Sequence, residues 1–273
     1  MSGVDSLQES LGTVQNRANQ VDPSIISLAE RPDLLPAFRD ESLQAAWPPF
    51  MLQDPLAHLI YAPGRIERFF DFSLVAVESD RPEVVLGRAV SVPFCLGAEF
   101  GRPDLPTGGW DTAVRWADQD LFLGRTPNAV CALEILVHPS YAGQGLSGRL
   151  LDAVRVNSAR LGFGALYVPV RPSQKHLHPH VPMADYVQRM RDDGLPSDAW
   201  LRIHVRAGGR VVGVANHSMT IAGTLDDWRS WTGMPFEESG AIEVPGALGP
   251  VHVSVEQNYA VYVEPNVWVC HKI

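Results

Sequence analysis

The most informative segment of the chain runs Val137-His138-Pro139-Ser140-Tyr141-Ala142-Gly143-Gln144-Gly145-Leu146-Ser147-Gly148-Arg149-Leu150. It follows the apolar run 130–137 and leads into a pattern typical of a helix. Glycines let backbone N–H groups approach a phosphate closely, and the N-terminus of a helix adds the positive end of its dipole. The segment therefore predicts a strand, a glycine turn and a helix that together bind an anion.

The composition is that of a globular protein with an acidic balance. The chain has 273 residues, of which 45% are hydrophobic and 19% are charged, so it can bury a sizeable core. The formal net charge is −9. This charge disfavours nucleic acid and anionic membranes as partners and suits a substrate that carries an amine. We expect a single domain over residues 1–273, with residues 1–22 as an N-terminal arm.

Three cysteines, Cys95, Cys131 and Cys270, show neither a CxxC motif nor the spacing of a disulfide framework. We interpret them as buried, inert thiols in a reducing compartment. The first residues have no basic region followed by an apolar one, and no apolar run approaches the roughly 18 residues of a membrane-spanning helix. These features predict a cytoplasmic protein.

Periodicity predicts a mixed α/β sheet that is mostly antiparallel, with one parallel pair near its middle. The two parallel strands, 130–137 and 165–170, are joined by a helix over 146–161. Further strands are predicted at 24–28, 72–78, 84–94, 200–205, 210–215, 251–256 and 260–263, and further helices at 33–47, 65–71 and 183–191.

Residues 95–128 interrupt this pattern with several glycines and prolines, and they include Trp110 and Trp116. Long irregular segments inside a domain are often lids or binding loops. We therefore expect a lid-like insertion here. Trp110 either covers the substrate or anchors its own loop.

The pattern V-x-P-x-Y-x-G-x-G-L over 137–146, between two strands and a helix, resembles motif A of the GNAT superfamily of N-acetyltransferases. The resemblance implies that strands 130–137 and 165–170 splay apart and that the pantetheine arm of an acyl-CoA lies between them. It also implies that the backbone amides of the turn bind the pyrophosphate. The implied donor contacts are Leu136, Val137, Gly143, Gln144, Gly145, Leu146, Ser147 and Gly148. No permanently bound cofactor is expected, because the thioester is itself a substrate.

A longer resemblance begins at Val181-Pro182-Met183-Ala184-Asp185-Tyr186 and continues through 193–206, 231–234 and 264–268. These segments are similar to GNAT-like proteins of polyketide and secondary-metabolite assembly. The similarity implies an extended C-terminal sheet region over 200–273. It also makes an acyl carrier protein a candidate partner.

Two positions depart from the superfamily pattern. Ala142 stands where Arg or Gln is usual, and Ser147 stands where Gly or Ala is usual. Without the Arg, a charge-assisted contact to a phosphate is lost. A carrier-bound phosphopantetheine has one phosphate and fits such a turn. Backbone amides could equally hold full CoA, so both donors stay open.

Two residues are candidates for proton transfer. Glu134 lies in an otherwise apolar strand, where a carboxylate must be paired or face a cavity. The resemblance implies that it acts as the base, and the alternative is a structural ion pair. His204 alternates with apolar neighbours, and it is either a catalytic or substrate-contacting group or a core histidine.

Other side chains have weaker claims. Tyr167, on the second splayed strand, either lines the acyl channel or belongs to the core. The run Lys175-His176-Leu177-His178-Pro179-His180 does not gather imidazoles on one face, so we expect no metal site.

The function predicted from these features is N-acyl transfer. The acyl group of acyl-CoA or of an acyl carrier protein would pass to a small-molecule amine. One alternative is a malonyl-thioester decarboxylase, for which the resemblance implies a His and a Thr. His204 matches, but the Thr position falls at Val170, which cannot donate a hydrogen bond. The other alternative is a non-catalytic thioester-binding protein with the GNAT fold.

Overall fold

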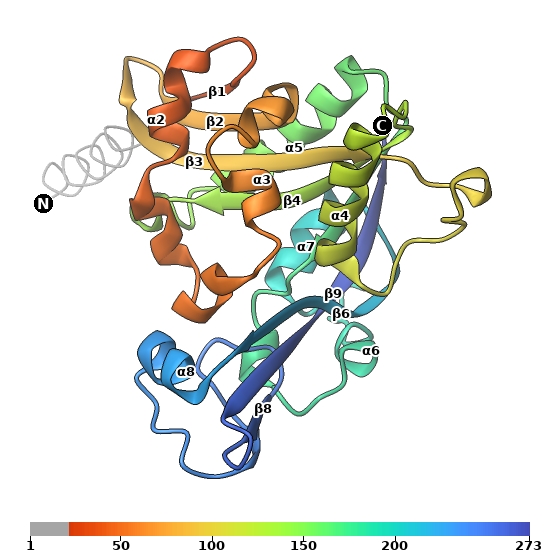
Figure 1. Cartoon of the computed structure of the whole chain (residues 1–273). Helices are drawn as coiled ribbons and strands as arrows, with labels where there is room; N and C mark the ends of the chain where they lie inside the picture. Colours follow the sequence, from red (N-terminus) through yellow and green to blue (C-terminus); the bar gives the residue numbers. More distant parts are fainter. Residues whose placement is uncertain (1–21) are drawn as a thin grey trace, which may run out of the picture.

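The computed structural model describes residues 22–273, so the predicted arm lies almost wholly outside the described residues. Nine strands form one mixed sheet (Figure 1). They are β1 (Pro23–Ser27), β2 (Ser73–Glu78), β3 (Arg81–Phe94), β4 (Ala129–Val137), β5 (Ala165–Val170), β6 (Arg210–Gly223), β7 (Gly240–Ile242), β8 (Val251–Ser254) and β9 (Tyr259–Lys272). The spatial order is β1-β2-β3-β4-β5-β9-β8-β7, and β6 pairs with β9 off this path. The mixed sheet predicted from periodicity is confirmed.

Helical segments cover both faces of this sheet. The α-helices are α2 (Leu35–Phe38), α3 (His58–Tyr61), α4 (Gly109–Phe122), α5 (Leu146–Arg160), α6 (Met183–Tyr186), α7 (Ala199–Arg206) and α8 (Leu225–Thr232). The 3-10 helices are η1 (Pro32–Leu34), η2 (Glu41–Ala46), η3 (Pro49–Gln53), η4 (Ile66–Phe72), η5 (Ala98–Phe100), η6 (Pro139–Tyr141) and η7 (Lys175–Leu177).

The central strands are buried on both sides, so alternate residues belong to different cores. Val75 and Val77 of β2 pack on the side of α4, and Leu74 and Ala76 pack on the side of α5. A third cluster lies in the C-terminal part of the sheet, where Trp228 of α8 contacts the ring of Phe50. Figure 1 shows this part below the rest of the sheet, on the long ribbon made by β6 and β9.

The parallel pair β4–β5 has the predicted form. Backbone pairing joins only Val130 to Leu166 and Cys131 to Tyr167, and β5 pairs instead with β9 along its whole length. The two strands therefore diverge beyond their first residues, as expected for the splayed pair. Helix α5 joins them and packs the apolar side chains of Leu150 and Val154 on the sheet.

Four local predictions were wrong. The predicted helix at 33–47 is broken into η1, α2 and η2, because Pro36 lacks the N–H that would continue it and Asp40 caps a new turn at Ser42. The predicted helix at 183–191 ends after one turn, as α6.

The predicted strand at 200–205 is helix α7. Its N-cap is Asp198, whose Oδ1 accepts hydrogen bonds from the N–H groups of Trp200 at 3.0 Å and Leu201 at 3.1 Å. The alternation of apolar residues there was too short to distinguish a strand from a helix.

Residues 95–128 contain a regular helix rather than a long loop. Trp110, Ala113, Val114 and Ala117 of α4 form a stripe at helical spacing that packs into the core. The segment is thus a supporting layer on one face of the sheet. Across residues 22–273, no helix combines the length and apolar character needed to cross a membrane.

Candidate functional site

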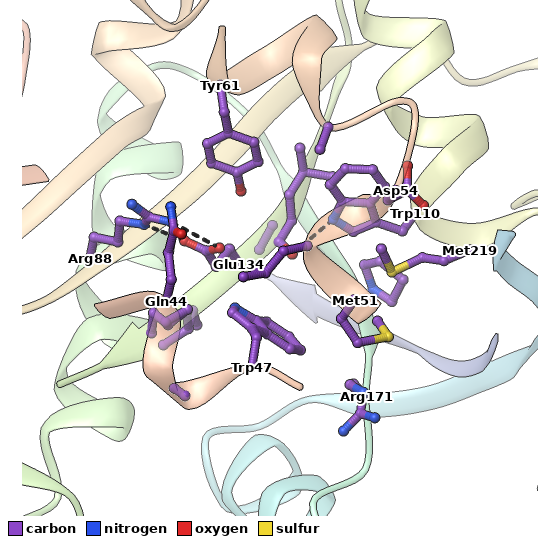
Figure 2. A pocket seen from close by; sticks show the side chains of 18 of the residues that line it. Gln44, Trp47, Met51, Asp54, Tyr61, Arg88, Trp110, Glu134, Arg171 and Met219 are labelled. Atoms are coloured by element: carbon purple, nitrogen blue, oxygen red, sulfur yellow. Dashed lines mark hydrogen bonds and ion pairs between the residues drawn. The ribbon is translucent and has the colours of Figure 1, made fainter. Parts of the chain in front are cut away.

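A cavity of about 770 Å³ extends from the splayed strands β4 and β5 to the N-terminal helical segments and the β6–β9 ribbon. Its walls come from segments far apart in the sequence (Figure 2). The lining includes 132–137 of β4, Ser147 of α5, 168–171 around the end of β5, Arg88 of β3, Trp110 of α4 and residues of the 38–66 region.

The wall formed by β4 contains a β-bulge. In the β3–β4 ladder Val90 faces Glu134 and the next residue, Ser91, faces Ala132, so Leu133 is the extra residue. A bulge leaves its extra residue out of the ladder and re-aims the neighbouring side chains. The Nε1–H group of Trp110 donates a hydrogen bond to the carbonyl oxygen of Leu133 at 3.1 Å. The bulged segment 132–134 is thus part of the cavity wall where β4 and β5 part.

The glycine turn lies at one end of this groove. Gly143 and Gly145 both have φ of +78°, a conformation that favours glycine. Gly145 is the N-cap of α5 and provides no side-chain cap, so the first N–H groups of that helix keep their hydrogen-bonding capacity. Of the predicted donor contacts, Leu136, Val137 and Ser147 line the cavity. Gln144, Leu146 and Gly148 lie in the adjoining turn and first helical turn.

Glu134 and Arg88 form a buried ion pair in the cavity wall. Arg88 Nε donates to Glu134 Oε1 at 2.5 Å and Arg88 Nη2 donates to Oε2 at 3.4 Å. Arg88 Nη1 also donates to the carbonyl oxygen of Phe38 at 2.9 Å. The side chains of Glu134 and Arg88 are 9% and 8% exposed. The pair keeps Glu134 as an oriented carboxylate at the point where the cavity meets the bulge.

Tyr61 lies against this pair, with its ring 5.5 Å from the Arg88 guanidinium. Burial, and secondarily the charge of Glu134, raise the pKa of the Tyr61 hydroxyl well above its ordinary value. The phenol therefore stays protonated and can only donate or accept hydrogen bonds near neutral pH. Figure 2 shows Tyr61 and Trp47 on either side of Glu134.

A second charged group occupies the other end of the cavity. Glu264 is fully buried and accepts hydrogen bonds from Arg171 Nε at 2.9 Å and from the Tyr262 hydroxyl at 3.0 Å. Asp54, from the end of η3, lies in the same wall next to Trp110 (Figure 2). This end therefore carries an excess of carboxyl groups over guanidinium groups.

His204 does not share the cavity with Glu134. Helix α7 buries it completely, with Nδ1 3.0 Å from Nε2 of His271 and the Trp200 ring packed edge-on at 4.5 Å. Burial, and then the neighbouring His271, lower the pKa of His204 to about 3, so the imidazole is neutral. This is the environment of a core histidine, the alternative interpretation of its sequence pattern.

The two aromatic candidates differ in position. Trp110 lines the cavity as part of its wall and is 7% exposed, so it does not form a cover. Tyr167 packs in the core, edge-on to Phe94 at 6.5 Å, and is not part of the cavity lining. Burial raises the pKa of its hydroxyl.

The cysteines and histidines form no further reactive centre in residues 22–273. All three thiols are buried and unpaired with one another, and burial raises the pKa of each. The same part of the chain contains no cluster of His, Cys, Asp and Glu able to hold a metal ion.

Sequence reasoning missed Asp54, Tyr61, Arg88, Arg171 and Glu264. A signal existed for one of them: Arg88 interrupts an apolar strand just as Glu134 does, and two opposite charges in neighbouring buried strands suggest a pair. The others lie in irregular segments or follow no recognisable spacing.

Comparison with known proteins gave one relative in sequence and several in fold. No family model matches the chain. The chain is 32% identical over 276 residues to the arginine N-acetyltransferase avaD of Aspergillus versicolor, covering 92% of this chain and 94% of that protein. Among solved structures it resembles the loading GNATL domain of CurA from Lyngbya majuscula, with a TM-score of 0.50, 15% identity and coverage of 93% and 98%. It also resembles the GphF GNAT-like decarboxylase in complex with isobutyryl-CoA, with a TM-score of 0.47, 15% identity and coverage of 86% and 96%.

Proposed function

The chain belongs to the GNAT superfamily of N-acetyltransferases, and on this premise we propose that it transfers an acyl group from a phosphopantetheine thioester to the amine of a small molecule. The observation that carries this proposal is the continuous cavity. It connects the open glycine turn and the splayed strands to a buried carboxylate, Glu134, and to an acidic far end. A donor and a cationic acceptor can therefore occupy the same cavity together.

The donor binds in the groove between β4 and β5. Backbone amides of the turn 143–148 hold its phosphate groups at the N-terminus of α5. Its pantetheine arm follows Leu136 and Val137, so that the thioester carbonyl lies beside the bulge at Leu133. In this proposal the backbone N–H groups of the bulged segment stabilise the oxyanion of the tetrahedral intermediate.

The acceptor amine attacks the thioester carbon from the wide part of the cavity. A C–N bond forms and the C–S bond breaks. Glu134 accepts the proton that the amine loses, directly or through a water molecule, and that proton passes to the departing thiolate. Arg88 acts as a positioning residue because it holds both oxygens of Glu134. Placing both substrates in one cavity provides much of the rate enhancement.

Acetyl-CoA and arginine are the first donor and acceptor to test, because the relative in sequence is named an arginine N-acetyltransferase. We place the reaction in secondary metabolism and in the cytoplasm, where free thiols such as Cys131 persist. Ala142 is exposed and leaves the turn without a guanidinium group, so carrier-bound acyl donors are tested in parallel.

Malonyl decarboxylation is not proposed. Val170 lines the cavity where that chemistry would place a hydrogen-bond donor, and His204 lies outside the cavity. Val170 therefore has the position without the donor group, and His204 has the imidazole without the position.

The experiment is a thioester-consumption assay with acetyl-CoA, malonyl-CoA and acyl carrier protein donors against a panel of amines. Free thiol and product mass are measured together. We expect thiol release that depends on the amine and yields one acylated product. If no donor is consumed with any amine while donor binding is retained, the chain is a thioester-binding protein and transfer is refuted.

A further inference from the structure

Two neighbouring carboxyl groups lack a counter-ion among the described residues, and one of them, that of Asp54, lines the cavity. Asp54 follows η3, and Asp111 lies in the first turn of α4. They are 5% and 6% exposed, and they lie close enough together for each carboxyl group to affect the pKa of the other. Neither carboxyl group forms a salt bridge to an Arg or Lys within residues 22–273.

One oxygen of each carboxyl group is held in place by the backbone. Asp54 Oδ1 accepts from the Leu56 N–H at 2.7 Å, and Asp111 Oδ2 accepts from the Thr220 N–H on β6 at 3.2 Å. The other two oxygens, Asp54 Oδ2 and Asp111 Oδ1, are buried and accept from no N–H or O–H group of the described chain. Two buried carboxyl groups this close together cannot both be ionised near neutral pH without a cation beside them. The pair thus shares one proton.

Within the described part of the chain, no neighbouring side chain neutralises the Asp54–Asp111 pair. Glu264 lies close enough to Asp54 to disfavour its ionisation, although Arg171 neutralises Glu264 itself. The Arg115 side chain turns to the backbone carbonyl of Asp111, so it does not ion-pair with that carboxyl group. Burial, and then the charge of Asp54, raise the pKa of Asp111 to about 8.

A buried carboxyl pair of this kind reduces stability, and two apolar residues of similar size would cost less. The position of the pair beside the cavity suggests a binding role that offsets this cost. Asp54 lines the cavity, and Figure 2 shows it beside Trp110, with Met51 and Met219 near it and with Glu134 between it and Arg88. An aromatic and thioether surface next to two carboxyl groups is suited to a delocalised organic cation.

We propose that the Asp54–Asp111 pair binds a second, non-reacting cationic group of the acceptor, a guanidinium or ammonium group, and so selects dibasic amines as substrates. The inference rests on the proposed function and names the acceptor class for that same cavity. The cation takes the place of the shared proton, which leaves to solvent as both carboxyl groups ionise. A guanidinium group has enough N–H donors to bond to both oxygens that now lack partners.

The test compares arginine with citrulline, which has the same shape but a neutral urea in place of the guanidinium group. Wild type, Asp54→Asn, Asp111→Asn and the control Asp118→Asn are assayed with each acceptor. Asp118 is on the same helix as Asp111 but pairs with Arg65 and Arg68 away from the cavity lining. We expect a kcat/KM ratio for arginine over citrulline of about 100 in wild type and in Asp118→Asn, falling about tenfold or more in the two pair variants.

A binding measurement makes the result independent of turnover. Calorimetry in buffers of different ionisation enthalpy is expected to detect release of about one proton when arginine binds to wild type near neutral pH. Release should vanish in Asp111→Asn, where no shared proton remains. Because both variants remove a buried charge, thermal unfolding is expected to show them folded.

Each outcome separates the two proposals. If wild type consumes thioester with arginine and citrulline equally well, or if the ratio survives both variants, the cation subsite is refuted and acyl transfer stands. If no thioester is consumed but arginine binds with proton release that requires Asp111, acyl transfer is refuted and the subsite stands.

Discussion

Replacing His204 and His271 together by leucine should make the folded chain less sensitive to acid. Both imidazoles are fully buried and share one hydrogen bond, Nδ1 to Nε2, while His204 Nε2 and His271 Nδ1 have no partner in the described chain. Burial, and then His271, lower the pKa of His204 to about 3. Burial, and then Arg155, lower the pKa of His271 to about 4. The folded chain therefore keeps both imidazoles neutral in mild acid.

The size of the effect follows from the unfolded state, where each imidazole has a pKa of about 6.5. A depressed folded-state pKa means that this contribution to stability is present above about pH 6.5 and is lost as the pH falls toward the folded values. At a cost of about 1.4 kcal/mol for each pH unit below that value, each imidazole loses about 2 kcal/mol by pH 5. The pair therefore removes about 4 kcal/mol of unfolding free energy between pH 8 and pH 5.

Urea unfolding at the two pH values measures this difference. The double variant should lose about 4 kcal/mol less than wild type over the interval, whatever its stability at pH 8. Exposed His252 provides the control, since His252→Leu removes an imidazole that already contacts solvent. An unchanged loss in the double variant would refute the argument that folding holds two neutral imidazoles in the core.

The same variant addresses the catalytic role predicted for His204. Because His204 lies outside the cavity, kcat for acyl transfer at pH 8 should stay within about threefold of wild type. If kcat fell about 100-fold or more in a folded double variant, His204 would have a role in catalysis after all.

Other substitutions test the donor groove and the proposed base. Glu134→Gln should lower kcat about 10²- to 10⁴-fold with little change in the KM of the donor, and a pH–rate profile that keeps its acidic limb would contradict the base assignment. Gly145→Ala should destabilise the chain by about 1–2 kcal/mol because of its φ of +78° and raise the KM for acyl-CoA, measured by thermal unfolding and steady-state kinetics. Trp110→Phe should remove about 1 kcal/mol of stability with the hydrogen bond to Leu133, and full stability would mean that water replaces that bond. Ala142→Arg should lower the KM for acetyl-CoA about tenfold and leave that of a carrier-bound donor nearly unchanged, and equal effects on both would argue against a phosphate contact at this position.

The central unit was predictable because its signals are local. Gly143 and Gly145 adopt the left-handed conformation that glycine favours, and Leu150 and Val154 form the apolar stripe that sets α5 on the sheet. The short pairing of β4 with β5 then follows the motif. Where the local pattern was brief, as at 200–205, it was compatible with two structures, and the Asp198 cap decided between them.

The site was only partly predictable, because a side chain's role depends on what folding brings near it. Glu134 was identified as a carboxylate in an apolar strand, but its partner Arg88 is 46 residues away and on another strand. His204 was an equally good candidate from its pattern. Folding buries it against His271, which lies 67 residues further along the chain. No sequence pattern pointed to Asp54, because its proposed role depends on the neighbouring carboxyl group of Asp111, which only folding brings close.

The sequence alone was enough for the strand–turn–helix unit, the mixed sheet and the parting of strands β4 and β5, because backbone conformation and apolar periodicity are encoded within a few turns of chain. Which charged groups face the cavity was decided by tertiary structure. The protonation of His204 and Asp54 depends on burial and on the nearest ionisable groups, and the ion pair of Glu134 depends on Arg88; these partners come from segments distant in sequence.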